Sequence, residues 1–339
     1  MSLKDSGQYY HEVLKRIPPR AFPVFEDPGM QERVWGRRWG VYHDVGTLRL
    51  VLVHRPGDEV RLMTADRYDP GIEALIDDDA QWYWRGDRAP DLPKMQAEHD
   101  ALVAALQREG VEVVHVDGAP TDPKAMFTRD TGVVLQGGVV ICRMGPVGRA
   151  PGTGRRGEEA FVTRRLAALG MPILRTIHGS GLFEGGSFTL LNQTTAAAGL
   201  SYRQNEEAAR QLEEVLAVQG TRLLRVPLAG HALHLDGQLV MVDHDLALVN
   251  VERTPYWFLD TLRELKIRVV ELHHADNPRV LNCLAVRPGK VLLAVNNGDA
   301  TAERLVDHGV EVVPLDYAEC QQNGGGLHCS TLPLVRERD

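Results

Sequence analysis

The feature that most constrains the fold is a pattern that recurs five times along the chain. Each copy begins with an amphipathic helical stretch, whose apolar residues follow i, i+3, i+4 spacing. After a Gly or polar break it continues into a short strand rich in Val, Leu and Ile. The copies span residues 96–117, 158–177, 205–228, 256–273 and 301–316. Because one such unit cannot bury both its sheet and its helix, the copies are expected to stack on one another.

Further β-type runs lie between these copies and complete the repeat. They cover residues 47–55, 131–143, 187–199, 237–250 and 283–296. Turn signals such as Gln136-Gly137-Gly138 and Pro288-Gly289 divide them into hairpin-like pairs. The repeat therefore predicts strand–strand–helix–strand (ββαβ) units, with the β run at 330–335 closing against the N-terminal strands.

This order of elements predicts an α/β fold, namely a five-bladed pseudo-symmetric α/β propeller that forms one catalytic domain over residues 46–339. The alternative is a doubly wound open sheet, but such chains lack a hairpin in every unit and usually carry a Gly-rich fingerprint, which is missing here. Two segments fall outside the pattern. Residues 1–45 are expected to form an irregular N-terminal segment. Residues 60–95 are expected to form a long loop, either a lid or a surface excursion.

Charge and composition limit the kinds of molecule that the protein is expected to bind. The formal net charge is −8 over 339 residues, which disfavours nucleic acid and anionic membranes and mildly favours a cationic small molecule. No run approaches the apolar length of a membrane helix. The start of the chain lacks a signal-peptide core, so a cytoplasmic location is expected. The composition leaves a homo-oligomer open.

The chain has four cysteines, none of them in a CxxC pair. Neither a zinc site nor a disulfide framework is therefore indicated. No HExxH or HxH pair accompanies the acidic residues. We expect no metal and no cofactor.

Unusual polar residues recur at one phase of the repeat, just before a hairpin or the closing strand. Taken alone, each has an ordinary explanation as a turn cap, a core histidine or a packed cysteine. In a ring of units, however, equivalent positions meet at the pseudo-symmetry axis, so we expect one shared pocket. The residues concerned are Asp130, Glu184, His234, Asp236, Asn282 and Cys329.

These residue types suit a guanidino substrate. Carboxylates bind the planar guanidinium cation through paired hydrogen bonds. Its central carbon is a poor electrophile, and among side chains at neutral pH a thiolate is the suitable nucleophile. A histidine can protonate the departing amine and then activate water. Glycines before Cys329 would let the backbone approach the substrate closely.

At these positions the sequence resembles the guanidino-group modifying superfamily of arginine deiminases, dimethylargininases, agmatine deiminases and amidinotransferases. The motifs that carry the resemblance are FTRDTG (127–132), EGGS (184–187), HLD (234–236) and GGGLHCSTLPLVR (324–336). The superfamily has the five-bladed α/β propeller fold. The resemblance implies that Cys329 is the nucleophile of a covalent amidino-thioether intermediate and His234 the general acid and base. Asp130 and Asp236 would grip the guanidinium, and Glu184 would assist His234.

The resemblance also implies arginines for a substrate carboxylate. Arg203 stands at one such position and Arg149 at the other, with Arg155 or Arg156 as alternatives if the spacing shifts. Phe127 and Arg129, in the same motif as Asp130, are further candidates for substrate binding.

The resemblance implies a hydrolase that cleaves a C–N bond of arginine or an arginine derivative, in the manner of arginine deiminases and dimethylargininases. Some features depart from individual members. Gln322-Asn323 replaces an arginine found in arginine deiminases, and Asp236 replaces the lysine typical of dimethylargininases. Two alternatives stay open: an amidinotransferase that passes the amidino group to an amine, and a non-catalytic propeller that binds guanidines.

Overall fold

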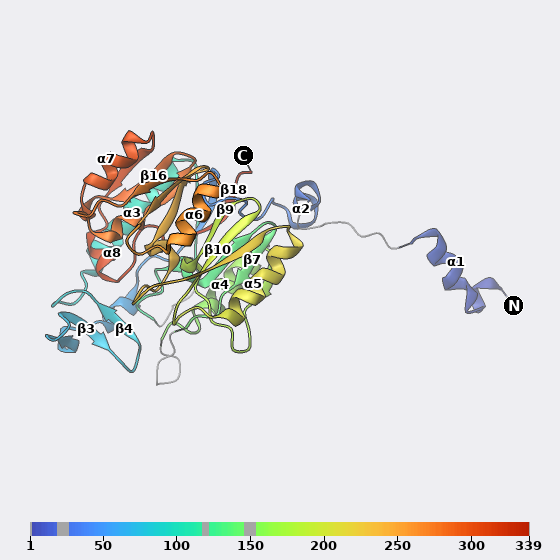
Figure 1. Cartoon of the computed structure of the whole chain (residues 1–339). Coiled ribbons are helices and arrows are strands. Elements are labelled where there is room, and N and C mark those ends of the chain that lie inside the picture. The colour runs from blue at the N-terminus through green and yellow to red at the C-terminus, as the bar shows by residue number, and fades with distance from the viewer. Residues whose placement is uncertain (1, 19–26, 117–121, 146–153, 339) are drawn as a thin grey trace.

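The computed structural model describes residues 2–18, 27–116, 122–145 and 154–338. Figure 1 shows an α/β body from which the first helix lies apart. No helix in these described ranges is long and apolar enough to cross a membrane.

Five three-stranded sheets share one topology, in which an antiparallel pair is followed by a third strand parallel to the middle one. The first sheet joins the two ends of the body, because the last strand pairs with the first. Its strands are β18 (Leu332–Arg336), β1 (Leu48–Val53) and β5 (Glu112–His115). The second contains β6 (Gly132–Leu135), β7 (Gly138–Ile141) and β8 (Ile173–Thr176).

The other three sheets repeat this arrangement further along the chain. The third contains β9 (Phe188–Asn192), β10 (Thr195–Leu200) and β11 (Arg222–Pro227). The fourth contains β12 (Leu239–Asp243), β13 (Leu246–Val249) and β14 (Arg268–Glu271). The fifth contains β15 (Leu284–Arg287), β16 (Lys290–Ala294) and β17 (Glu311–Leu315).

A helix precedes the third strand of each sheet, as the repeat predicted. These helices are α3 (Leu92–Arg108), α4 (Glu158–Ala168), α5 (Glu206–Val218), α6 (Tyr256–Glu264) and α7 (Ala300–Asp307). The break after four of them is a glycine with positive φ, the conformation that ends a helix with least strain; these are Gly110, Gly170, Gly220 and Gly309. After α6 the same position is Lys266, at φ 61°.

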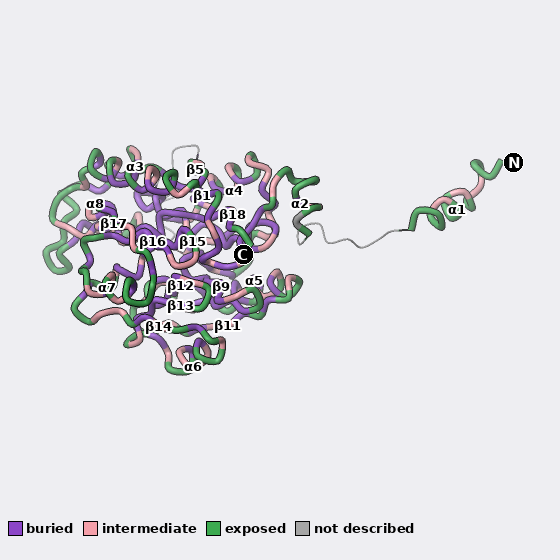
Figure 2. The backbone as a smooth tube through the Cα atoms, turned by 90° about the horizontal axis from the view of Figure 1, so that it is seen from above, coloured by how far each residue is buried: buried purple, intermediate pink, exposed green. Residues whose placement is uncertain are grey.

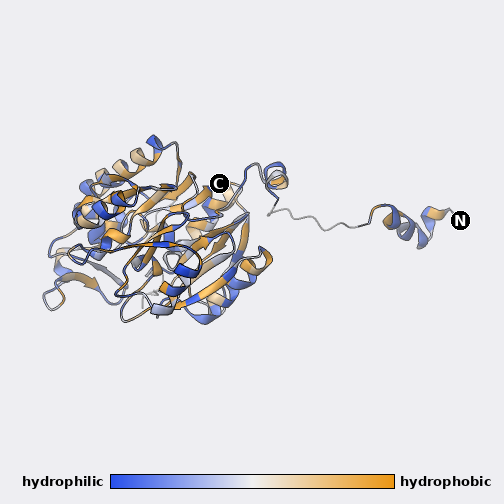
Figure 3. Cartoon of the chain, turned by 45° about the horizontal axis from the view of Figure 1, so that its top comes forward, coloured by the Kyte–Doolittle hydropathy of each residue, from blue (hydrophilic) through white to orange (hydrophobic). Residues whose placement is uncertain are grey.

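The strands are buried and the helices cover them. Strands β6, β7 and β16 are buried along their whole length, and Figure 2 shows buried strands inside and exposed helical surfaces outside. Figure 3 shows the matching pattern, with apolar strands and helices that carry polar outer faces. Burial of these apolar faces is what stabilises the stacked units.

Short helical turns lie directly before the first strands of the second to fifth sheets. They are η4 (Thr128–Thr131), η5 (Gly185–Ser187), η6 (Leu235–Gly237) and η7 (Pro278–Leu281), which precede β6, β9, β12 and β15. Each turn contacts the next in this order. First strands of different units also touch where β18 contacts β6, β9 contacts β12 and β12 contacts β15, and β15 contacts β1, the middle strand of the first sheet.

Residues 60–95 differ from the expected long loop. They contain an antiparallel sheet of β2 (Tyr68–Asp69), β3 (Ala74–Asp77) and β4 (Trp82–Trp84), which we call the insert sheet, beside two short turns, η2 (Asp58–Leu62) and η3 (Ala65–Arg67). Its pairing places Leu75 beside Trp84, and both side chains are buried. The aromatic residues that suggested a loop are therefore anchors for a sheet.

The insert sheet is docked on α8 (Ala318–Gln322), the helix before the glycine run. The backbone N–H of Arg85 donates to the Gln322 carbonyl at 2.9 Å. The backbone N–H of Asp91 donates to Glu319 Oε1 at 2.9 Å.

The segment before β1 holds η1 (Leu3–Asp5), α1 (Gln8–Arg16) and α2 (Pro28–Trp35). Helix α1 has no buried residue and lies away from the body in Figures 1 and 2. Gly40, by contrast, forms a bridge with Val335 of β18.

Candidate active site

The polar residues of successive units converge on one pocket of about 490 Å³. Asp130, His234, Asp236 and Cys329 all line it. Glu184 is fully buried and lies behind His234, where it contacts the imidazole instead of the pocket. Residues from different repeat units therefore form one site, as their common phase in the repeat predicted.

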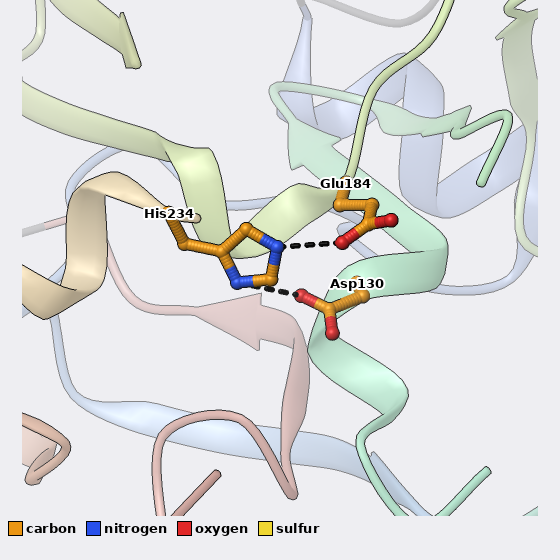
Figure 4. A group of neighbouring side chains, drawn as sticks. All are labelled: Asp130, Glu184 and His234. Carbon is orange, nitrogen blue, oxygen red and sulfur yellow. Dashed lines mark hydrogen bonds and ion pairs between the residues drawn. The ribbon is translucent and has the colours of Figure 1, made fainter. Parts of the chain in front are cut away.

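Each ring nitrogen of His234 faces a carboxylate, as the two dashed lines in Figure 4 show. Its Nε2 is 2.6 Å from Glu184 Oε2, and its Nδ1 is 3.6 Å from Asp130 Oδ1. Burial lowers the pKa of His234, but Asp130, Glu184 and Asp236 outweigh it and raise the pKa to about 9. The free site therefore holds an imidazolium at neutral pH.

Glu184 stays ionised in this buried place. Burial raises its pKa, but the hydrogen bond and charge of His234, together with Arg203 and Arg155, outweigh it and lower the pKa to about 2. The Arg203 Nη1 is 3.3 Å from both Glu184 oxygens. Glu184 is thus a permanently ionised carboxylate that orients the His234 imidazole and keeps it protonated.

Cys329 is held by Asn282, the polar residue of the fifth unit. The Asn282 side-chain amide donates to Cys329 Sγ at 2.9 Å, and its oxygen accepts from the Cys329 backbone N–H at 3.0 Å. Burial, followed by the negative charges of Asp236 and Asp130, raises the pKa of the Cys329 thiol well above its ordinary value. Without a bound cation the sulfur is therefore a protonated thiol.

Asp236 is oriented by the residue next to the cysteine. His328 Nδ1 lies 2.9 Å from Asp236 Oδ2, and Cys329 Sγ lies 3.5 Å from the same oxygen. Burial, and then the positive charge of Arg129, lower the pKa of His328, so the neutral ring donates its Nδ1–H to the carboxylate.

Asp130 is held from two sides. Its Oδ1 accepts from the Gly186 backbone N–H at 3.2 Å, and its Oδ2 accepts from Arg155 Nη1 at 2.6 Å. Arg155 also makes two bonds of 2.9 Å to Glu158. One edge of the Asp130 carboxylate is thus occupied by a guanidinium of the protein itself.

Two glycines of the site lie so close to neighbouring groups that a side chain has no room. A Cβ on Gly186 would stand 2.9 Å from both Asp130 Oδ1 and His234 Nδ1. A Cβ on Gly325 would stand 2.6 Å from the Phe127 ring. Both distances are shorter than carbon atoms tolerate, so side chains at these positions would displace the groups that line the pocket.

Comparison with known proteins identifies the family of the chain. A family model described as N,N dimethylarginine dimethylhydrolase, eukaryotic, matches residues 76–336. The chain belongs to this family. The membership confirms the resemblance to guanidino-group modifying enzymes and the expectation of a hydrolase that acts on C–N bonds of linear amidines.

Relatives of this dimethylarginine dimethylhydrolase family member include arginine deiminase from Bacillus cytotoxicus, 22% identical over 424 residues that cover 88% of this chain and 98% of the relative. Among solved structures, DDAH from Pseudomonas aeruginosa in complex with citrulline has a TM-score of 0.66 at 20% identity, over 85% of this chain and 100% of that one. Inosamine-phosphate amidinotransferase from Streptomyces griseus has a TM-score of 0.66 at 17% identity, over 89% and 98%. The α/β fold is common to these structures.

The candidate substrate-binding residues fall into three groups. Phe127 and Arg203 line the pocket. Arg129 does not; its Nε lies 3.5 Å from the His328 carbonyl, and its side chain borders a separate small cavity beside Asp44. Arg149 lies outside the described residues. Arg155, its alternative, lines the pocket but is engaged by Asp130 and Glu158.

Asn282 and His328 were not assigned roles from the sequence. Asn282 stands at the common phase of the repeat, and that phase is the sequence signal for its position beside Cys329. His328 is next to Cys329 in the chain, but nothing in its spacing distinguishes a buried histidine that bonds Asp236.

Asp130, Glu184 and His234 bring three potential metal-ligand atoms within 4.8 Å of one another. Two of them already have cationic partners, since Arg155 binds Asp130 and Arg203 binds Glu184. The raised pKa of His234 also favours the imidazolium, which has no lone pair for a metal. These features fit an acid–base site better than a metal centre.

Proposed function

We propose that this protein hydrolyses a C–N bond of arginine or an arginine derivative through a covalent amidino-thioether on Cys329. The observation that carries the proposal is the convergence of Cys329, His234, Asp130 and Asp236 on one pocket. A thiol nucleophile, a charged histidine and two carboxylates are the groups that this reaction needs.

Substrate binding begins at the carboxylates. Asp236 has its Oδ2 beside both His328 and Cys329, so a guanidinium bound to it lies next to the sulfur. Asp130 supplies a second anionic partner from the side of His234. Paired carboxylates offset the cost of removing the cation from water.

The bound cation then activates the nucleophile. The two carboxylates that raise the thiol pKa become neutralised by the guanidinium, so the pKa of Cys329 falls and the proton is lost to solvent. The Asn282 amide stabilises the resulting thiolate. The sulfur attacks the central carbon, forming a C–S bond.

His234 completes the exchange. As imidazolium it donates a proton to the departing nitrogen, and the C–N bond breaks to leave the thioether. The neutral imidazole then accepts a proton from water, whose oxygen attacks the same carbon. The C–S bond then breaks and the added hydroxyl loses its proton to solvent, releasing a neutral ureido product and the Cys329 thiolate.

The five similar sheets support a further part of the proposal. We propose that they form a five-bladed pseudo-symmetric propeller within a single catalytic domain over residues 46–339. The contacts of β18 with β6, β9 with β12, β12 with β15 and β15 with β1, and the pairing of β18 with β1, support such a ring. The substrate would bind where the turns η4 to η7 meet.

Incubation with arginine in water enriched in ¹⁸O tests the function, with ureido product scored by mass spectrometry. Wild type is expected to form citrulline carrying one ¹⁸O, and Cys329→Ser none. Ureido product from Cys329→Ser at the wild-type rate would contradict the proposal. Location in the cytoplasm stays a prediction.

Amidino transfer is the second candidate, because inosamine-phosphate amidinotransferase shares the fold. In that reaction an amine replaces water, so ornithine would appear without ¹⁸O in any product and only when an acceptor amine is added. The hydrolase family model favours water as the acceptor.

A further inference from the structure

The turn that carries Cys329 is closed on its buried side by Ser330. The Ser330 hydroxyl donates to the Gly326 carbonyl at 2.8 Å, and the Ser330 backbone N–H donates to the same oxygen at 3.0 Å. Asn282 holds the other side of the turn through the Cys329 sulfur and backbone N–H. Cys329 is thus fixed between a residue that lines the pocket and one that is fully buried.

The Gly326 backbone acts on the sulfur itself. Burial, and then the charge of Asp236, raise the pKa of the Cys329 thiol, whereas a hydrogen bond with the Gly326 backbone lowers it. Gly326 is also tightly packed, because a Cβ there would stand 2.9 Å from Asn282 Oδ1. A shift of the Gly326 backbone would therefore change both how readily the thiolate forms and where the sulfur lies.

A buried tyrosine bonds Ser330 from behind. The Tyr317 hydroxyl donates to Ser330 Oγ at 2.9 Å, and both side chains are completely shielded from solvent. Burial raises the pKa of Tyr317 well above its ordinary value, so the hydroxyl stays protonated and able to donate. A chain of buried hydrogen bonds therefore runs from Tyr317 through Ser330 to Gly326.

Tyr317 is itself fixed by its place at the start of α8, where it is the N-cap residue. The buried carboxylate of Glu98, in α3, accepts from two backbone N–H groups in the first turn of α8, at 2.9 and 2.8 Å. Such a carboxylate stabilises the N-terminus of a helix. At the other end of α8, the Gln322 carbonyl accepts from the Arg85 backbone N–H, directly after the insert sheet. Because α8 is held at both ends, Tyr317 is a firm support for the cysteine turn.

We propose that Tyr317 is a positioning residue for Cys329, whose hydroxyl acts through Ser330 to fix the Gly326 backbone and keep the sulfur beside Asn282. The effect on turnover rests on the proposed function. Neither Tyr317 nor Ser330 lines the pocket that the described residues form. Their hydroxyls therefore act on the attack by the sulfur and leave guanidinium binding unchanged.

Tyr317→Phe tests the proposal, because it removes one hydroxyl and keeps the ring. We expect kcat with arginine to fall about 3- to 10-fold, the range for a single hydrogen bond, with KM unchanged. The pH midpoint of Cys329 alkylation by iodoacetamide should move upward, because the sulfur is held less firmly by the groups that lower its pKa. Ser330→Ala should produce both changes. The double variant should match Ser330→Ala alone, since Tyr317 acts only through Ser330.

Thr221→Val is the matched control, because the buried Thr221 hydroxyl donates to the Gln193 carbonyl at 3.1 Å, outside the pocket. It should lower thermal stability as Tyr317→Phe does, yet keep the wild-type kcat and alkylation midpoint. Wild-type kcat and midpoint in a less stable Tyr317→Phe would mean a purely structural hydroxyl and would overturn the proposal. A raised KM with unchanged kcat would overturn it too. Alkylation needs no turnover, so a wild type that forms no ureido product would count against the proposed hydrolysis alone.

Discussion

Asn282 holds Cys329 at two atoms: its amide nitrogen lies 2.9 Å from the sulfur, and its oxygen accepts from the cysteine backbone N–H at 3.0 Å. The first bond favours the thiolate and the second fixes the main chain beneath it. A residue outside the usual catalytic types thus opposes the burial that keeps the thiol protonated.

Asn282→Ala should raise the thiol pKa further and lower turnover about 10- to 100-fold, the range for a hydrogen bond to a charged group. The measurement is the rate of Cys329 alkylation by iodoacetamide against pH, whose midpoint should move upward. Asn282→Asp keeps the acceptor for the backbone N–H but puts an anion near the sulfur, so its midpoint should move further still. An unchanged midpoint in both variants would show that Asn282 does not act on the thiol.

Asp236→Asn should change two properties in opposite directions. Alkylation of free Cys329 should become faster at pH 8, because the carboxylate 3.5 Å from the sulfur no longer raises the thiol pKa. Turnover should fall at least about 100-fold, because the guanidinium loses a buried anionic partner. Asp245→Asn, a surface carboxylate paired with Arg268, should change neither rate. Parallel loss of both rates in Asp236→Asn would indicate misfolding.

The activity of the enzyme should fall at high pH, where His234 loses its proton. Its pKa is raised to about 9, so the imidazolium needed to protonate the leaving nitrogen is present below that pH and is lost as the pH rises through it. Glu184→Gln removes one of the charges that raise this pKa, and the fall in activity should move to lower pH. The pH profile of kcat/KM, which reports ionisations of the free enzyme, measures it. A fall that stays at the same pH would separate His234 from the proton transfer.

Gly186→Ala should reduce turnover strongly, because the new methyl group would stand 2.9 Å from both Asp130 Oδ1 and His234 Nδ1. Gly7→Ala is the control, since nothing lies within 4 Å of its added Cβ, its φ is −62°, and it lies outside the pocket. The control should keep wild-type kcat and thermal stability. Full activity in Gly186→Ala would mean that the backbone can move without disturbing the catalytic groups.

The sequence predicted the repeat unit well, because helix and strand periodicities differ and each helix ends at a local break such as Gly110 or Gly220. The common phase of Asp130, Glu184, His234 and Cys329 predicted that they come together, and in the structure Asp130, His234 and Cys329 line the pocket while Glu184 lies behind His234. The prediction depended on the symmetry of the units, because these residues are far apart in the chain.

Other features depend on pairings that have no periodic signal. Residues 60–95 were expected to form a loop because β3 and β4 show no regular alternation of apolar and polar residues. The insert sheet is stabilised instead by the packing of Leu75 and Trp84. The bond from Arg155 to Asp130 is another such case, because spacing along the chain cannot show which carboxylate an arginine reaches. Arg129 lies next to Asp130 in sequence, yet its side chain lies outside the pocket.

The most direct test of the account is to trap the covalent intermediate. Wild type is mixed with arginine, quenched in acid within one turnover, and digested for peptide mass mapping. The account predicts an amidino-thioether adduct on the peptide that contains Cys329, absent from Cys329→Ser and from peptides that contain Cys142, Cys283 or Cys320. Citrulline formed in a single turnover with no adduct on Cys329 at any quench time would contradict it.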